Sequence, residues 1–397
     1  MKSTLTFAVI LLALTLSSQN QGIKFEHESF EVLKAKAIKE NKLIFIDAYT
    51  TWCGPCKYLA REIFTNDSVG NYYNSNFINA KMDMEKGEGL AFAKNYQVYC
   101  YPTLLFIDGK GNLVHRTAGA GDVSRILALG KQALRPEGTY SYHKANYEKD
   151  KNNSKYLMHY INAQASNCLH PDQEVKAYFN LQKEEDLVSA DNWTMIKAHV
   201  KDMNSREFKF LLQNKNKFES LYSKEEVSDK IDNVHFYSLM NIIRQKNFDK
   251  EKYESTKVSI RKTNLGNTDR IILEADLVLA KSKKDWEAYC KSLETNTEKF
   301  YWNDAGQLNS IAWTVFENVS EKKHLEMAEK WAKRATEIEP GYANLDTYAN
   351  LLFKNGKNSE ALKAAGEAIE LAKKDGDKPE DYKETTDLIE KIKSAKP

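Results

Sequence analysis

Two cysteines separated by two residues are the clearest candidates for chemistry in this chain. Cys53 and Cys56 stand where an apolar run, 43–49, gives way to a helix-like run, 57–64. A strand that delivers a C-x-x-C pair to the first turn of a helix is typical of thiol–disulfide exchange. Helix-start N–H groups and the positive end of the helix dipole favour thiolate, so Cys53, the outer cysteine, is the expected nucleophile. Cys56, one turn further on, would resolve the mixed disulfide.

Half of a zinc site, a purely structural disulfide and a chance pair are the alternatives for a lone C-x-x-C. Zinc normally takes two more Cys or His ligands at short spacing. The other cysteines are Cys100, Cys168 and Cys290, with no second close pair. The eight histidines show no metal or triad spacing that we recognise. We therefore expect redox chemistry, with no metal and no cofactor.

The residues around the pair carry a family resemblance. Asp47 through Lys57 reads D-A-Y-T-T-W-C-G-P-C-K, which resembles the active-site segment of the thioredoxin family. Further on, Tyr101-Pro102-Thr103 is similar to the cis-proline loop of that family, and Gly119 matches the glycine after its last strand. The likeness covers about residues 23–135. It is closer to the thioredoxin-like domains of periplasmic disulfide reductases than to plain thioredoxin.

The resemblance implies a role for each matched residue. Cys53 would attack, Cys56 would resolve, and Asp47 would be the buried acid that accepts and returns the proton of Cys56. Burial raises the pKa of a carboxyl group, which suits a base that works near neutral pH. The other matched residues would contact substrate or form the active-site loop: Trp52, Tyr101, Pro102 and Gly119 in the first group, and Gly54, Pro55 and Lys57 in the second.

The residue types alone leave two of these roles open. Asp47 ends an apolar strand, where a satisfied turn or cap aspartate is an equal alternative. Pro102 stands at a strand start, where a missing N–H is tolerated in any case. The resemblance implies instead that Pro102 is cis, and that the backbone of Tyr101 pairs with an extended substrate segment.

Cys100 lies only two residues before Pro102 and has two interpretations. It is either a small apolar filler, as many free cysteines are, or a third thiol that modulates the site or links two chains. Together with Cys168 and Cys290 it makes an odd set of three. In an oxidising compartment at least one of these thiols should stay free or pair between molecules.

Hydrophobic patterning predicts the elements that position the pair. The run 43–46 is continuously apolar, as expected of a central strand covered on both faces. Asp108-Gly109-Lys110-Gly111 predicts a hairpin between strands 103–107 and 113–117. In helix 29–40 the expected buried stripe is Phe30, Leu33, Ala37 and Ile38. The predicted order, β-α-β-α-β-β-α, gives an α/β thioredoxin fold with a central mixed sheet and helices on both faces.

The chain of 397 residues is too long for this fold alone. The basic start and the apolar run Leu5–Leu16, followed by Ser17-Ser18-Gln19, predict a signal peptide over 1–18, with a retained anchor or buried helix as the alternative. We expect a thioredoxin-like domain over 22–136. An all-α domain over 140–397 should follow, because later apolar residues recur at helical spacing.

The end of the chain contains an internal repeat. Ala328, Ala332 and Ala335 recur 33 residues later as Ala361, Ala365 and Ala368. Small residues let paired helices pack closely, and the period is near the 34 residues of tetratricopeptide repeats, which we expect over about 305–375. The alternative is an irregular helical domain with chance alanines.

These patterns predict an exported thiol–disulfide oxidoreductase, in a bacterial periplasm, that reduces protein disulfides. The Gly-Pro dipeptide between the cysteines matches the reducing members of the family. A reductant in an oxidising compartment must itself be re-reduced, so we expect a membrane-embedded electron donor. The helical domain would offer a surface for a protein partner. A net charge of +2, from 58 basic and 56 acidic residues, argues against nucleic acid.

Two alternatives to reduction stay open at the level of the sequence. One is a disulfide oxidase or isomerase that uses the same cysteines. The other is a scaffold or binding protein, in which the helical domain recruits a partner and the thioredoxin fold is secondary.

Overall fold

The computed structural model describes residues 22–265 and 267–394 of the chain. The predicted signal peptide, 1–18, lies outside the described residues. The chain divides into two compact units, 1–195 and 196–397. The predicted domain boundary near 136–140 falls inside the first unit and stays a prediction. Within the part of the chain that is described, no helix has both the length and the apolar content to cross a membrane.

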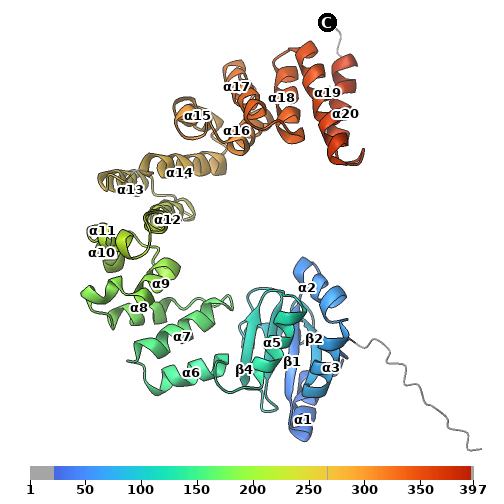
Figure 1. The fold of residues 1–397 in the computed structure, drawn as a ribbon, viewed down its shortest axis with the longest axis vertical. Coiled ribbons are helices and arrows are strands. Elements are labelled where there is room, and N and C mark those ends of the chain that lie inside the picture. The colour runs from blue at the N-terminus through green and yellow to red at the C-terminus, as the bar shows by residue number, and fades with distance from the viewer. Residues whose placement is uncertain (1–21, 266, 395–397) are drawn as a thin grey trace, which may run out of the picture. The chain divides into compact units, whose positions relative to one another are not determined.

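The first unit begins with a mixed four-stranded sheet and its helices (Figure 1). The strand order is β2-β1-β3-β4, with β1 parallel to β2 and the other neighbours antiparallel. The elements are α1 (Phe30–Glu40), β1 (Leu43–Tyr49), α2 (Gly54–Tyr58), the π-helical turn η1 (Leu59–Ile63), α3 (Asp67–Asn76), β2 (Phe77–Asp83), α4 (Gly89–Asn95), β3 (Thr103–Ile107), β4 (Leu113–Ala118) and α5 (Val123–Ala133). The predicted fold class and element order are confirmed.

Strand β1 is covered on both faces, as its apolar run predicts. Phe45 packs into a core with η1, α3 and α5, including Tyr73 of α3. Its neighbours Ile44 and Ile46 point to the other face, where they pack with Leu33 of α1 and with α4. Because successive side chains of a strand alternate between faces, this one strand supports both cores. The C-x-x-C pair follows directly after it.

The hairpin prediction is confirmed and one burial prediction is wrong. Strands β3 and β4 pair antiparallel, and the backbone N–H of Asp108 donates to the carbonyl of Asn112 at 3.0 Å across the turn. In α1, Leu33 and Ala37 are buried as expected, but Ile38 is 64% exposed. One residue rotates a helix by about 100°, which takes Ile38 away from the face that Ala37 presents to the sheet.

Helices complete the first unit after the sheet. They are α6 (Tyr140–Lys149), α7 (Ser154–Ala165), α8 (Asp172–Asn180), the short 3-10 helix η2 (Glu184–Val188) and α9 (Ala190–His199), which runs on into the second unit. Helix α6 packs against β4 at the edge of the sheet. There the backbone N–H of Tyr140 donates to Nδ1 of His115 at 3.2 Å.

The second unit is helical in the part that is described. Its helices are α10 (Arg206–Gln213), α11 (Lys215–Leu221), α12 (Lys224–Ile243), α13 (Lys250–Lys262), α14 (Thr268–Lys283), α15 (Trp286–Phe300), α16 (Ala305–Asn318), α17 (Lys322–Ile338), α18 (Tyr342–Lys354), α19 (Asn358–Asp375) and α20 (Lys383–Ser394). The repeated alanines of α17 and α19 are all buried where neighbouring helices pack. The all-α prediction is confirmed, and assignment to the tetratricopeptide class stays a prediction.

Candidate active site

Cys53 and Cys56 form a disulfide at the start of α2, and their Cα atoms are 5.3 Å apart. Cys53 is the N-cap residue of this helix, and its Sγ accepts a hydrogen bond from the backbone N–H of Cys56 at 3.1 Å. In the reduced protein the same N–H group would stabilise a thiolate at position 53, because the first N–H groups of a helix have no partner within it. The cap geometry therefore favours Cys53 as the nucleophile.

Exposure does not distinguish the two cysteines. Cys53 is 3% exposed and Cys56 is 4% exposed, so both sulfurs are buried in the oxidised protein. The two residues differ in their place on the helix: Cys53 caps it from an extended backbone, whereas Cys56 lies within its first turn. This difference follows from chain direction, since only the first cysteine can cap.

The residues between and after the two cysteines form the first turn of α2, as their types predict. Gly54 and Pro55 form its first turn, where the missing N–H of proline is not needed. Lys57 is exposed, and its backbone N–H donates to the carbonyl of Cys53 at 3.2 Å.

Asp47 is fully buried in β1 and lies opposite Lys81 of the parallel strand β2. The Nζ of Lys81 is 3.5 Å from Oδ2 of Asp47, and neither carboxyl oxygen has a closer hydrogen-bond partner. Burial raises the pKa of Asp47 to about 6, and the positive charge of Lys81 opposes that rise. A carboxyl group with this pKa can exchange a proton near neutral pH. Its expected role toward Cys56 stays a prediction.

Aromatic rings hold the ammonium group of Lys81 in place. Its Nζ lies 5.4 Å from the ring centre of Phe25, 5.1 Å from that of Tyr49 and 5.9 Å from that of Phe64. These are cation–π distances. Phe25, Phe64 and Lys81 also line an open cavity of about 800 Å³, so Lys81 stands between the buried carboxyl group of Asp47 and solvent. The sequence analysis missed Lys81, for which the only signal was a cation in an apolar strand.

The exposed ring of Trp52 and the half-buried ring of Tyr101 lie side by side next to the cysteine pair. Trp52 is 64% exposed, and its indole Nε1 donates to both carboxylate oxygens of Glu85, at 3.0 and 3.1 Å. The ring of Tyr101 meets that of Trp52 edge-on, with ring centres 6.0 Å apart. Glu85 is a second residue that the sequence analysis missed, because it lies in a polar loop with no motif.

Pro102 and Gly119 meet at the same end of the antiparallel strands β3 and β4. The Tyr101–Pro102 peptide bond is cis, as the resemblance implied. Gly119 follows β4 with a φ of +87°, a conformation that favours glycine. Its backbone N–H donates to the carbonyl of Pro102 at 2.9 Å. The structure thus brings together the matched residues of the cis-proline loop and the last strand.

Both interpretations of Cys100 that the sequence suggested are wrong. Cys100 is bonded to Cys168 within the chain, so it is neither a free filler nor a link between two chains. Cys290 is free and buried in α15, where burial raises the pKa of its thiol to about 12. One thiol thus stays free, as the odd count predicted. The pairing of Cys100 and Cys168 could not be read from a separation of 68 residues.

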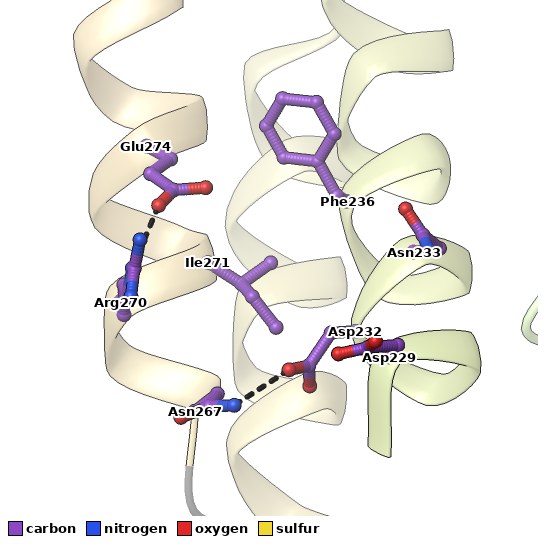
Figure 2. Close-up of a pocket in the computed structure, with 8 residues that line it drawn as sticks. All are labelled: Asp229, Asp232, Asn233, Phe236, Asn267, Arg270, Ile271 and Glu274. Atoms are coloured by element: carbon purple, nitrogen blue, oxygen red, sulfur yellow. Dashed lines mark hydrogen bonds and ion pairs between the residues drawn. The ribbon is translucent and has the colours of Figure 1, made fainter. Parts of the chain in front are cut away.

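A separate cavity of about 490 Å³ lies between α12 and α14 of the second unit (Figure 2). Its charged groups are partly paired across and along its walls. Asn267 donates to Asp232 at 2.7 Å, and Arg270 forms an ion pair with Glu274 at 2.9 Å. None of the residues that line it carries a thiol, so it takes no part in the chemistry of the cysteine pair.

Fold and site together define a dithiol–disulfide protein of the thioredoxin type, and comparison with known proteins agrees. The thioredoxin family model matches residues 23–130. Thioredoxin of Mycobacterium bovis is 31% identical over 115 residues, which is 29% of this chain and 90% of that protein. Thioredoxin-T of Drosophila melanogaster is 33% identical over 96 residues, 24% of this chain and 57% of that protein. The chain belongs to the thioredoxin family.

Two further matches concern disulfide isomerases. The protein disulfide-isomerase of Datisca glomerata is 27% identical over 137 residues, 33% of this chain and 27% of that protein. The solution structure of a candidate disulphide-isomerase from Bacteroides thetaiotaomicron is 46% identical and covers 30% of this chain and 99% of that one, with a TM-score of 0.28. The chain thus spans 57% of Thioredoxin-T and 27% of the plant isomerase.

Proposed function

We propose that this chain is an exported thiol–disulfide oxidoreductase that reduces protein disulfides. Cys53 is the nucleophile and Cys56 the resolving cysteine. The observation that carries the proposal is the disulfide at the N-terminus of α2, with the Cys56 N–H donating to the Sγ of Cys53. Trp52 and Tyr101, exposed and half-buried beside the pair, provide an aromatic surface on which a substrate can dock.

The reaction balances without any added group. The Cys53 thiolate attacks one sulfur of the substrate disulfide, forms a mixed disulfide and releases the other sulfur as a thiolate. Asp47 takes the proton of Cys56, whose thiolate then attacks the Sγ of Cys53 and releases the second substrate sulfur. The substrate gains two electrons, and the chain is left with the Cys53–Cys56 disulfide that the structure contains.

Trapping the mixed disulfide tests the proposal. Cys56→Ser cannot resolve, so the variant should accumulate a covalent adduct with a disulfide-bonded substrate protein on a non-reducing gel. Cys53→Ala, which removes the attacking sulfur, should form none. Absence of an adduct with Cys56→Ser, together with an unchanged cellular phenotype for Cys53→Ala, would favour the scaffold alternative.

The direction of electron flow needs its own measurement. Reduction is favoured by the Gly-Pro dipeptide between the cysteines, whereas two of the similar proteins carry the name of disulfide isomerases. Equilibration of the pair with reduced and oxidised glutathione gives its potential. A value near the oxidising end of the family range would overturn the reductase proposal. If the pair is reducing, export requires a membrane-embedded electron donor to restore the dithiol.

A further inference from the structure

The Cys100–Cys168 disulfide joins the loop that carries Pro102 to the turn between α7 and α8. The Cα atoms of the two cysteines are 6.2 Å apart, and Cys100 lies two residues before Pro102. Consecutive Cα atoms are separated by about 3.8 Å, or about 2.9 Å across a cis bond, so Cys168 lies at most about 13 Å from Pro102. A substrate segment of a few residues beside Pro102 spans that distance.

The turn that contains Cys168 is well ordered by its own contacts. The backbone N–H of Leu169 donates to the carbonyl of Gln164 at 3.1 Å, and the side chain of Leu169 is buried. The amide of Asn167 donates to the carbonyl of Ala163 at 2.7 Å. Cys168 itself has a left-handed backbone, with a φ of +56°. These contacts make the turn a fixed extension of α7.

Two of the attachments between these helices and the sheet bear on the position of the turn. One attachment is non-covalent, at the edge of β4, where Tyr140 donates to His115 at 3.2 Å and its ring packs on Tyr160 of α7 at 5.9 Å. The other is the disulfide. At its near end, the hydroxyl of Thr103 donates to the carbonyl of Cys100 at 2.7 Å, which anchors that residue to β3. With both attachments the turn cannot move away from the cis-proline loop.

The turn and the loop leave side chains available to a partner. Ser166 and His170, on either side of Cys168, are exposed, and Tyr99 beside Cys100 is 62% exposed. A substrate segment that paired with the backbone of Tyr101 and continued toward Cys100 would run toward this turn, because Cys168 is bonded to Cys100. A surface that is rigid before binding adds contacts without the cost of ordering a loop.

We propose that the α7–α8 turn, residues 166–170, forms a second contact surface for substrate, in addition to Trp52 and Tyr101. The Cys100–Cys168 bond holds this surface, here called the wall, in place, and the wall contributes to the recognition of protein disulfides. This inference rests on the proposed function and adds a specificity determinant to it. Small disulfides reach Cys53 without touching the wall, whereas a protein disulfide carries flanking chain that meets it. Cys100 and Cys168 are positioning residues in this scheme.

Single-turnover oxidation of the full chain tests the wall. Wild type and Cys100→Ser/Cys168→Ser are first reduced at Cys53–Cys56. Mass spectrometry after alkylation is then used to verify that the wild type has kept its second disulfide. Each protein is mixed with excess insulin or with hydroxyethyl disulfide, with no other reductant present. Cys290→Ala, which changes a cysteine outside the first unit, is the matched control.

The double variant should need about five to ten times more insulin for half-maximal rate, with a maximal rate within twofold of wild type. Its rate with hydroxyethyl disulfide should change less than twofold. Unchanged insulin kinetics would contradict the proposal that the turn contacts substrate. Equal losses of rate on both substrates would also contradict it, because they would mean that the bond only shapes the cis-proline loop. No oxidation of the wild type by either substrate would overturn the proposed function itself.

A second variant covers the case in which the double variant does not fold. Ser166→Arg/His170→Glu keeps the disulfide and changes only exposed side chains of the turn. Its half-saturating insulin concentration should shift at least threefold from wild type. A value equal to that of wild type would overturn the wall.

Discussion

At the scale of single residues, burial and the neighbouring Lys81 together set the pKa of Asp47. The carboxyl group is fully buried, and the ammonium group of Lys81, on the adjacent strand, lies 3.5 Å from it. Burial penalises the ionised form more than one such neighbour can offset, so the pKa of Asp47 rises to about 6. A residue kept in this state costs stability, which fits a functional role better than a structural one.

Replacing Asp47 should stabilise the protein in a pH-dependent way. Because its folded pKa, about 6, exceeds the ordinary value near 3.9, the folded state binds the proton more tightly and stability falls as pH rises between them. Asp47→Asn should therefore raise the free energy of unfolding by about 2–3 kcal/mol at pH 7.5 and by little below pH 4. Denaturant unfolding at both pH values measures this. An equal gain at both would contradict the assignment.

The aromatic rings around Lys81 should affect the titration of Asp47. Lys81→Met removes the positive charge and should raise the pKa of Asp47 further. Phe64→Leu, which removes one ring at 5.9 Å, should raise it less. Carbon-13 NMR of the Asp47 carboxyl group gives both values. Phe92→Leu, in the core on the opposite face of the sheet, is the control and should leave the pKa unchanged. A Lys81→Met protein in which Asp47 titrates as in wild type would exclude the coupling.

At the scale of elements, the ends of strands and the start of one helix assemble the site. Strand β1 ends near Asp47 and leads to the cap of α2, while β3 begins just after Pro102 and pairs with β1 through Thr103 and Ala48. The residue after β4, Gly119, donates to the carbonyl of Pro102. The active site is therefore a product of strand register, which a single local change can disturb.

Gly119→Ala tests this dependence on local backbone. The φ of Gly119 is +87°, which an L side chain adopts at a cost of about 1 kcal/mol or more, although a Cβ there would meet no other atom within 4 Å. The variant should lose about that much stability in chemical denaturation. Gly54→Ala is the control, since its added Cβ also meets nothing and its φ is not positive. Equal stabilities for the two variants would show that backbone conformation is not the cause.

At the scale of the whole molecule, a covalent bond joins the first helices after the sheet to the loop that carries Pro102, within one compact unit. The disulfide from Cys100 to Cys168 closes a segment of 68 residues that includes β3, β4 and α5 to α7. A bond of this kind restricts the unfolded chain and so favours the folded one. It also places helical residues beside a thioredoxin-type site.

Loss of this bond should lower the stability of the first unit alone. Cys100→Ser/Cys168→Ser should destabilise residues 22–195 by about 2–4 kcal/mol, the usual effect of removing a disulfide that closes a long segment. Hydrogen exchange of the full chain can report each unit by its peptides. Protection should fall in β3, β4 and α7 and stay unchanged in α16 to α19. A uniform loss over both units would contradict the prediction.

Much of the thioredoxin-like part of the chain could be predicted, because the sequence patterns that specify its strands and turns are local. The apolar run of β1, the turn glycines after β3 and the C-x-x-C pair before α2 each specify structure within a few residues. The family resemblance added the cis bond at Pro102, which the structure contains, and it singled out Gly119, whose role toward substrate stays a prediction. Ile38 was misplaced because a helical stripe read from spacing alone includes residues at its margin, and only packing shows which side of that margin is buried.

By itself, the sequence determined the cysteine pair, the helix that follows it, the order of strands and helices along the first part of the chain, and the helical character of the described remainder. These features depend on neighbouring residues and on hydrophobic period. The tertiary structure alone decided that Lys81 faces Asp47, that Trp52 binds Glu85 and that Cys100 bonds to Cys168. Each of these pairs joins positions 33 or more residues apart, and contacts at such separations follow from strand register and helix packing rather than from local pattern.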